Sequence, residues 1–269
     1  YIHEHPEKYV NSMARVENTE LDGGLPTIEG EETRESPTGT PGEESNADKL
    51  KRLEAILMQD GLNSDAYHAA AIAIANIARS TPGLIKESTV TALERMLNKE
   101  GLSDFAYYYA AGAINDIARS TPGLIKESTV ISLERALNKE GLHGDTYYSA
   151  ACAIATITTN RPGFIKEFTV TSLERVLNEE GLHPIAYSAA ASAIAEIANN
   201  KPALFFRVYP IIRSLIANGK ESLAEEIVNR ISSLPNEAIK DIPGANWPNI
   251  LSQMPPTVTP EGATEDFTL

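Results

Sequence analysis

A forty-residue repeat limits what this chain can fold into more than any other feature of its sequence. The fourteen residues IARSTPGLIKESTV occur twice, unchanged, forty residues apart. Residues 61–100 and 101–140 share 29 identical positions without a gap. Repeats of this length are typical of proteins built from stacked supersecondary units, because one unit alone cannot bury its apolar faces. The four units are 61–100, 101–140, 141–180 and 181–220.

Each unit has the pattern of two helical segments joined by a tight turn. In the first unit, apolar residues recur at spacings of three and four, which predicts an amphipathic helix over 64–79. Pro82 follows directly and favours the first turn of a new segment. We expect a short turn at 82–87 and then a second helix over 89–99, with Gly101 as its C-terminal cap.

The composition changes along the chain and predicts its domain organisation. The segment before the repeats is rich in Gly, Pro, Ser, Thr and Glu, which is typical of disorder. After the repeats, apolar residues recur on one face of a last helix that is charged on its other face, as a cap requires. The predicted parts are an eroded helical half-repeat at 1–20, a disordered acidic linker at 21–47, the repeat domain at 48–234 and an extended acidic tail at 235–269. The repeat domain adds to its four units a half-repeat at 48–60 and a capping helix at 221–234.

The net charge of −14 lies in the ends of the chain. Residues 1–48 carry 12 acidic and 3 basic side chains, and residues 221–269 carry 8 and 2. The middle, residues 49–220, carries 17 acidic and 18 basic side chains and so has a net charge of +1. A neutral core between acidic ends lacks the basic surface that DNA or RNA requires, which disfavours nucleic acid as the partner.

Other sequence features favour a soluble protein of a reducing compartment. No apolar run reaches the roughly 18 residues of a membrane span, so we expect no contact with a membrane. The single cysteine, Cys152, excludes an intramolecular disulfide, and we expect a cytoplasmic location. In the other units its place is taken by Ile72, Gly112 and Ser192, so we interpret Cys152 as a packing residue.

The sequence contains no pattern that predicts catalysis, a metal site or a cofactor. It has neither a glycine-rich phosphate loop nor a nucleophile elbow, and its five histidines have no metal-ligand spacing. We therefore expect a protein that is not an enzyme and has no cofactor. Glu94-Arg95 and its copies in later units are interpreted as solvated helix charges that form weak surface pairs.

The first helix of each unit resembles that of HEAT repeats and of the related armadillo repeats. The resemblance depends on the run Ala70-Ala71-Ile72-Ala73-Ile74-Ala75-Asn76-Ile77-Ala78 and on the segment Thr81-Pro82-Gly83-Leu84-Ile85-Lys86-Glu87. The matching first-helix segments of the later units are 110–118, 150–158 and 190–198.

The resemblance implies an all-α fold, a right-handed α-solenoid of about four HEAT/armadillo-like repeats with capping helices. It further implies a non-catalytic scaffold that binds a protein or peptide partner along its surface. Two alternatives stay open. Some HEAT-like solenoids bind nucleic acid, and HEAT-type bilin lyases are enzymes, but a fold does not by itself determine function.

The chain departs from the HEAT pattern at one position. HEAT units often carry an Arg just before the paired alanines, where it forms a ladder with Asp of the neighbouring unit. This chain has no arginine at that position, so a charged ladder of this kind cannot form. We expect the units to be held together by apolar packing and by hydrogen bonds from tyrosine hydroxyls. The residues at this position are His68, Tyr108, Tyr148 and Ser188.

Tyrosines provide the candidate binding residues. One tyrosine recurs in every unit and is interpreted as structural; the four are Tyr67, Tyr107, Tyr147 and Tyr187. Tyr108, Tyr109 and Tyr148 occur only in the central units, so packing does not require them at every copy. We hypothesise that these three form an aromatic patch for a protein partner, because tyrosine is enriched in binding hot spots. The alternative, that they are wedged between units, stays open.

Overall fold

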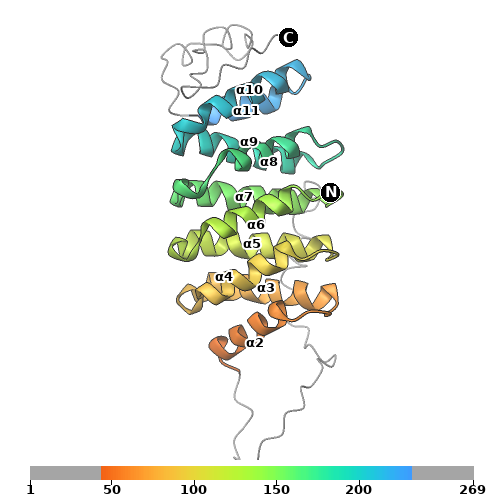
Figure 1. Ribbon diagram of the computed structural model, residues 1–269, viewed down its shortest axis with the longest axis vertical. Helices are drawn as coiled ribbons and strands as arrows, with labels where there is room; N and C mark the ends of the chain where they lie inside the picture. The colour runs from red at the N-terminus through yellow and green to blue at the C-terminus, as the bar shows by residue number, and fades with distance from the viewer. Residues whose placement is uncertain (1–43, 232–269) are drawn as a thin grey trace, which may run out of the picture. The chain divides into compact units, whose positions relative to one another are not determined.

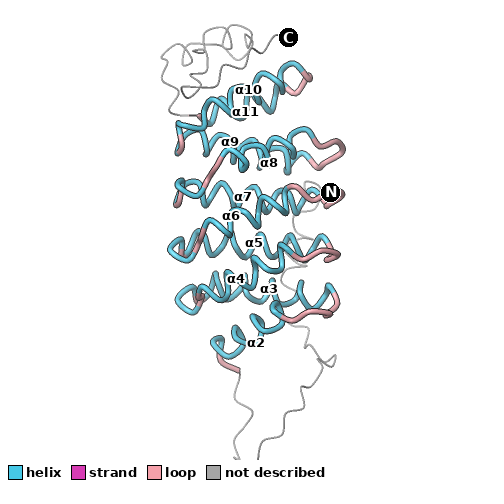
Figure 2. Tube along the Cα trace, in the orientation of Figure 1, coloured by secondary structure: helices cyan, strands magenta, loops and turns pink. Residues whose placement is uncertain are grey.

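The computed structural model describes residues 44–231, and all of their regular secondary structure is helical (Figure 2). The protein is therefore all-α over this range, as the sequence predicts. The predicted segments that lie wholly or mostly outside the described residues are 1–20, 21–47 and 235–269, together with the end of the predicted capping helix at 232–234.

The helices alternate between long and short. Four α-helices have 17 residues each: α3 (Ser64–Ser80), α5 (Asp104–Ser120), α7 (Gly144–Asn160) and α9 (Pro184–Asn200). The shorter ones are α2 (Asn46–Met58), α4 (Glu87–Asn98), α6 (Glu127–Leu137), α8 (Glu167–Asn178), α10 (Phe205–Ala217) and α11 (Glu221–Arg230). Short 3₁₀ helices follow each long helix: η2 (Pro82–Leu84), η3 (Pro122–Leu124), η4 (Pro162–Phe164) and η5 (Pro202–Leu204).

The described helices are arranged in two layers (Figure 1). In the long-helix layer, α3, α5, α7 and α9 pack side by side in chain order, and α11 packs against α9. In the short-helix layer, α2, α4, α6, α8 and α10 follow one another in the same way. Successive units therefore contact each other through like helices. The chain turns at two edges of this stack, one where long helices end and one where short helices end (Figure 2).

The turn from a long to a short helix follows from its sequence. Thr81 leaves helical geometry with φ −139°, and Pro82 then starts a 3₁₀ turn. The backbone N–H of Lys86 donates to the hydroxyl of Thr89, which caps the start of α4. The predicted break at 82–87 is confirmed, and α4 begins at Glu87.

The opposite turn differs from the prediction. Helix α4 ends at Asn98, and Lys99 is already extended, with ψ 144°. Gly101 takes φ +73° two residues later, within the turn. The prediction of Gly101 as a helix cap is therefore wrong; the glycine is needed because this turn itself requires a positive φ.

Small and branched side chains fill the space between the two layers. The paired alanines of each long helix are fully buried, and they allow the long helices to approach closely. Ile74, Ile114, Ile154 and Ile194 occupy one buried column of the long helices, and Leu93, Leu133 and Leu173 occupy a matching column of the short helices. Among residues 44–231, no helix has both the length and the apolar character that a bilayer crossing would require.

Candidate functional site

The tyrosine that recurs in every unit is a structural residue. Tyr67, Tyr107 and Tyr147 are at most 2% exposed, and Tyr187 is half-buried. Each hydroxyl donates to a backbone carbonyl in the turn that precedes its own helix, over 2.5–2.7 Å. The hydrogen bonds expected between units are therefore present. The acceptors are the carbonyls of Gln59, Lys99, Lys139 and Glu179.

A cation covers each of these tyrosine rings. The charged group lies over the ring face, a favourable cation–π geometry. Lys99 and Lys139 also form ion pairs with acidic residues of the preceding turn, at 2.6 and 2.7 Å. The pairs are Lys99 over Tyr67, Lys139 over Tyr107, Arg175 over Tyr147 and Lys220 over Tyr187, with the cation 5.0–5.7 Å from the ring centre.

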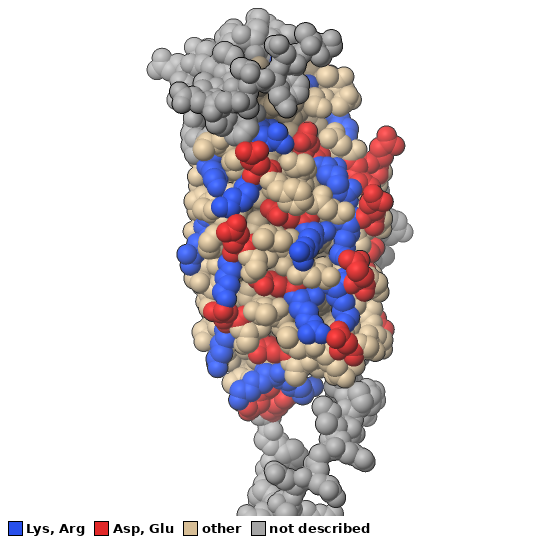
Figure 3. Space-filling view, viewed as in Figure 1, with Lys and Arg blue, Asp and Glu red and all other residues tan. Residues whose placement is uncertain are grey.

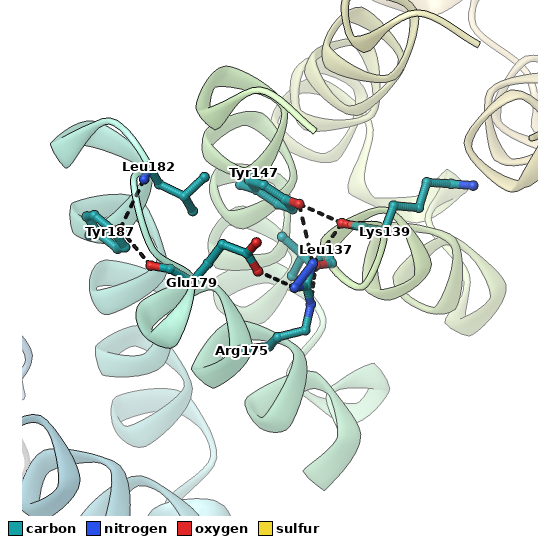
Figure 4. Close-up of polar contacts among 7 residues, drawn as sticks. All are labelled: Leu137, Lys139, Tyr147, Arg175, Glu179, Leu182 and Tyr187. Carbon is teal, nitrogen blue, oxygen red and sulfur yellow. Dashed lines mark hydrogen bonds and ion pairs between the residues drawn. The ribbon is translucent and has the colours of Figure 1, made fainter. Parts of the chain in front are cut away.

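In the third unit a different residue supplies the cation over the tyrosine ring. Glu179 stands where the first two units have lysine, and Arg175, one turn earlier, covers the Tyr147 ring instead (Figure 4). Its guanidinium donates to the carbonyls of Leu137 and Lys139, at 3.2 and 2.7 Å, and forms an ion pair with Glu179. The ion pair with Glu179 thus holds the arginine that replaces the missing lysine.

Polar contacts that the sequence did not predict also connect the short helices. The Thr129 hydroxyl donates to the Glu94 carboxylate and the Thr169 hydroxyl to that of Glu134, each over 2.5 Å. Glu134 is only 5% exposed, and burial raises its pKa above the usual range for glutamate. The interpretation of these glutamates as solvated charges is therefore wrong for Glu134, which is an inter-unit contact.

The exposed side of the short-helix layer carries a row of ion pairs between neighbouring helices. Lys126 pairs with Glu87, and Lys166 lies 3.8 Å from Glu127. In Figure 3, basic and acidic side chains alternate along the left-hand side of the described region, as these pairs require. Much of the charge on this face is thus neutralised within the protein.

The exposed side of the long-helix layer carries an aromatic cluster instead. The imidazole of His68 on α3 stacks on Tyr109 and on Phe105 of α5, with ring centres 4.8 and 5.8 Å apart. Tyr108 meets Tyr109 edge to face at 4.8 Å. Phe105 is 63% exposed, whereas Tyr108 and Tyr109 are half-buried. We call these four residues the aromatic cluster.

The structure brings together two of the three predicted site residues. Tyr108 and Tyr109 are both in the aromatic cluster, and Tyr109 also packs against the core. Tyr148 lies on the next long helix, where it is half-buried and packs against the core, as does Cys152. Its pKa is raised by Cys152 and by burial. Tyr148 therefore has a packing role of its own within α7.

His68 connects the two helices of the cluster. Its Nε2 atom is buried and has no hydrogen-bond partner among the described residues. Burial lowers the pKa of His68, while the charge of Asp65 acts in the opposite direction. Burial thus favours the neutral imidazole, which stacks between aromatic neighbours.

Phe105 was not predicted from the sequence, and His68 was predicted only as a member of its column. A signal for Phe105 was present, because the same position is Asp65 in the first unit and Asp145 in the third. The fourth unit carries Ile185 there, so the position is not uniformly acidic, but Phe105 is the large aromatic side chain at this position and is exposed.

The remaining candidate features of the described region are groups of metal-ligating side chains, the Cys152 thiol and one surface depression. Within residues 44–231 no group of three or more His, Cys, Asp or Glu side chains could hold a metal ion. Burial raises the pKa of Cys152, so its thiolate is disfavoured. A shallow, open depression between α2 and α4 is lined by Lys51, Glu54, Met58, Glu87 and Thr91. None of these features has the geometry of an active site.

Comparison with protein-family models and with curated protein sequences returned no match.

Proposed function

We propose that the chain is a right-handed α-solenoid of HEAT/armadillo type, with about four repeats and capping helices, and that it acts as a non-catalytic scaffold for a protein or peptide partner. The gapless forty-residue repeat and the two layers of like helices support this architecture. Stacked units of this kind present an extended regular surface, which suits a long contact with another protein.

The aromatic cluster is the observation that supports the function best. Phe105 exposes 63% of its surface on a helix face where the equivalent residues of two other units are acidic. Aromatic side chains on a rigid support lose little conformational entropy when a partner covers them, and they dominate binding hot spots. Tyr108 and Tyr109 extend the same surface, with Tyr109 also anchored in the core.

No observation of comparable weight favours the alternatives. A nucleic-acid scaffold needs an excess of unpaired basic side chains along its surface. The short-helix face instead alternates acids and bases that pair with each other. A bilin lyase-like activity has only the resemblance of the fold in its favour.

A pair of matched variants tests the proposal. Phe105→Ala and Phe168→Ala each remove one phenylalanine from a helix surface; Phe105 is 63% exposed on the long-helix face and Phe168 is 58% exposed on the short-helix face. We expect both variants to fold as the parent does, because exposed side chains contribute little to stability. In quantitative pull-downs from a cell extract, Phe105→Ala should lose proteins that the parent and Phe168→Ala both retain. Equal capture by all three proteins would contradict the proposal.

A further inference from the structure

The residue just before each proline differs between the two halves of the repeat array. In the first two units it is Thr81 and Thr121, whose hydroxyls donate to carbonyls of their own long helices over 3.3 and 3.2 Å. In the third and fourth units it is Arg161 and Lys201. At this one place in the fold, the first two units therefore carry a small neutral residue and the last two carry a cation.

Both cations extend back over the turn of the preceding unit. The Arg161 guanidinium donates to the Pro122 carbonyl over 3.2 Å, and the Lys201 ammonium donates to the Ile165 carbonyl. They therefore lie at the edge of the stack where long helices end and short helices begin. Lys126 and Lys166 lie at the same edge, directly before α6 and α8. We call these four residues the cationic edge.

Acidic side chains neutralise only part of this edge. Lys126 pairs with Glu87, and Lys166 lies 3.8 Å from Glu127. No carboxylate of residues 44–231 forms an ion pair with Arg161 or Lys201. Burial and the positive charge of Lys166 both lower the pKa of Lys201, while Glu127 opposes them. Positive charges crowd together here without enough counter-charge.

We propose that the cationic edge binds an acidic, extended segment of a partner protein. Neighbouring turns follow the spacing of packed helices, about 10 Å. A peptide in the polyproline II conformation advances about 3.1 Å per residue with about three residues per turn, so carboxylates at every third residue would face the same side and meet successive turns. A partner carboxylate would form with Arg161 an ion pair that no carboxylate of residues 44–231 supplies.

An acidic peptide suits this edge better than nucleic acid does. Its unpaired cations are confined to the turns of two units, which limits the number of phosphates they could contact. The opposite edge carries the exposed acidic residues Glu100, Glu140 and Glu180, which would repel a polyanion that extends around the protein. The proposal goes beyond the aromatic cluster, because it concerns a different surface and does not require the cluster.

The test uses the full chain and a fluorescein-labelled peptide with four glutamates, each separated by two Gly or Ser residues. The double variant Arg161→Thr/Lys201→Thr installs the residue that the first two units carry, so it should fold as the parent does. We expect it to weaken peptide binding at low salt by about tenfold or more, the loss of roughly one charge-assisted contact. The control Arg95→Gln/Arg135→Gln removes two positive charges near the other ends of the short helices and should change binding little.

Three outcomes would overturn the proposal. One is equal peptide binding by the parent and Arg161→Thr/Lys201→Thr. Another is an equal loss in both double variants, which would mean that only net charge matters. The third is tighter binding of a single-stranded RNA or duplex DNA oligonucleotide than of the peptide, with the same dependence on Arg161 and Lys201. Phe105→Ala should bind the peptide normally, which separates this result from the test of the aromatic cluster.

Discussion

At the scale of single residues, the differences between units are more informative than the identities. Tyr67 and its copies are the same in every unit because each ring fills the same gap and each hydroxyl has the same carbonyl to bond. The column that begins with His68 continues as Tyr108, Tyr148 and Ser188, so packing there does not require one particular side chain. At such positions, the units can change without loss of the stack.

His68 should make stability depend on pH. Burial lowers its pKa below the unfolded value of about 6.5, so the unfolded chain binds the proton more readily. Stability should therefore fall as pH decreases from about 7 to 5, and His68→Tyr, which installs the residue of the next unit, should remove this contribution. Urea unfolding of both proteins at the two pH values measures the difference. Equal losses of unfolding free energy on acidification would show that His68 titrates freely in the folded state.

Sequence alone could predict some of these residue roles. The invariant column of Tyr67 was correctly interpreted as structural, because a residue fixed in all copies indicates shared packing. Phe105 was missed because a single exposed substitution breaks the repeat without breaking helical periodicity. Glu134 was misjudged because its burial depends on where Thr169 of the next unit lies, and no local pattern encodes that distance.

At the scale of elements, the third unit shows how one contact can be preserved after a charge reversal. Glu179 removes the lysine that covers the tyrosine ring in earlier units, and Arg175 compensates from one turn away. Its contacts with two backbone carbonyls join α8 to the end of α6. The equivalent Arg95 is more exposed and only pairs with Asp60.

Arg175→Gln should therefore destabilise the protein more than Arg95→Gln does. We expect a loss of about 1–3 kcal/mol for Arg175→Gln, because two carbonyls lose a charged donor, and less than about 1 kcal/mol for Arg95→Gln, a surface pair. Chemical denaturation measures both values. In the Arg175→Gln background, Glu179→Lys places a lysine where the second unit has Lys139 over its tyrosine ring and should restore most of the loss. A double variant no more stable than Arg175→Gln would argue against the compensation.

At the scale of the whole molecule, the repeat predicted the helical fold and the approximate helix positions. Helix α3 spans 64–80 where 64–79 was predicted, and α4 spans 87–98 where 89–99 was predicted. The contacts between neighbouring units could not be predicted, because the sequence gives the period of the units and not the offset between neighbours. The hydrogen bonds from Thr129 to Glu94 and from Thr169 to Glu134 depend on that offset, and so does the aromatic cluster that joins α3 to α5.

The central claim is that the long-helix face is a surface for protein recognition. A photo-crosslinking phenylalanine analogue, placed at Phe105 or at Phe168 of the full chain, tests this claim most directly in living cells. The two positions are matched in residue type and in exposure, 63% and 58%, and differ in the face they occupy. We predict a discrete crosslinked protein from position 105 that is absent from position 168. The claim would be contradicted by the same products from both positions, or by a discrete product from position 168 alone.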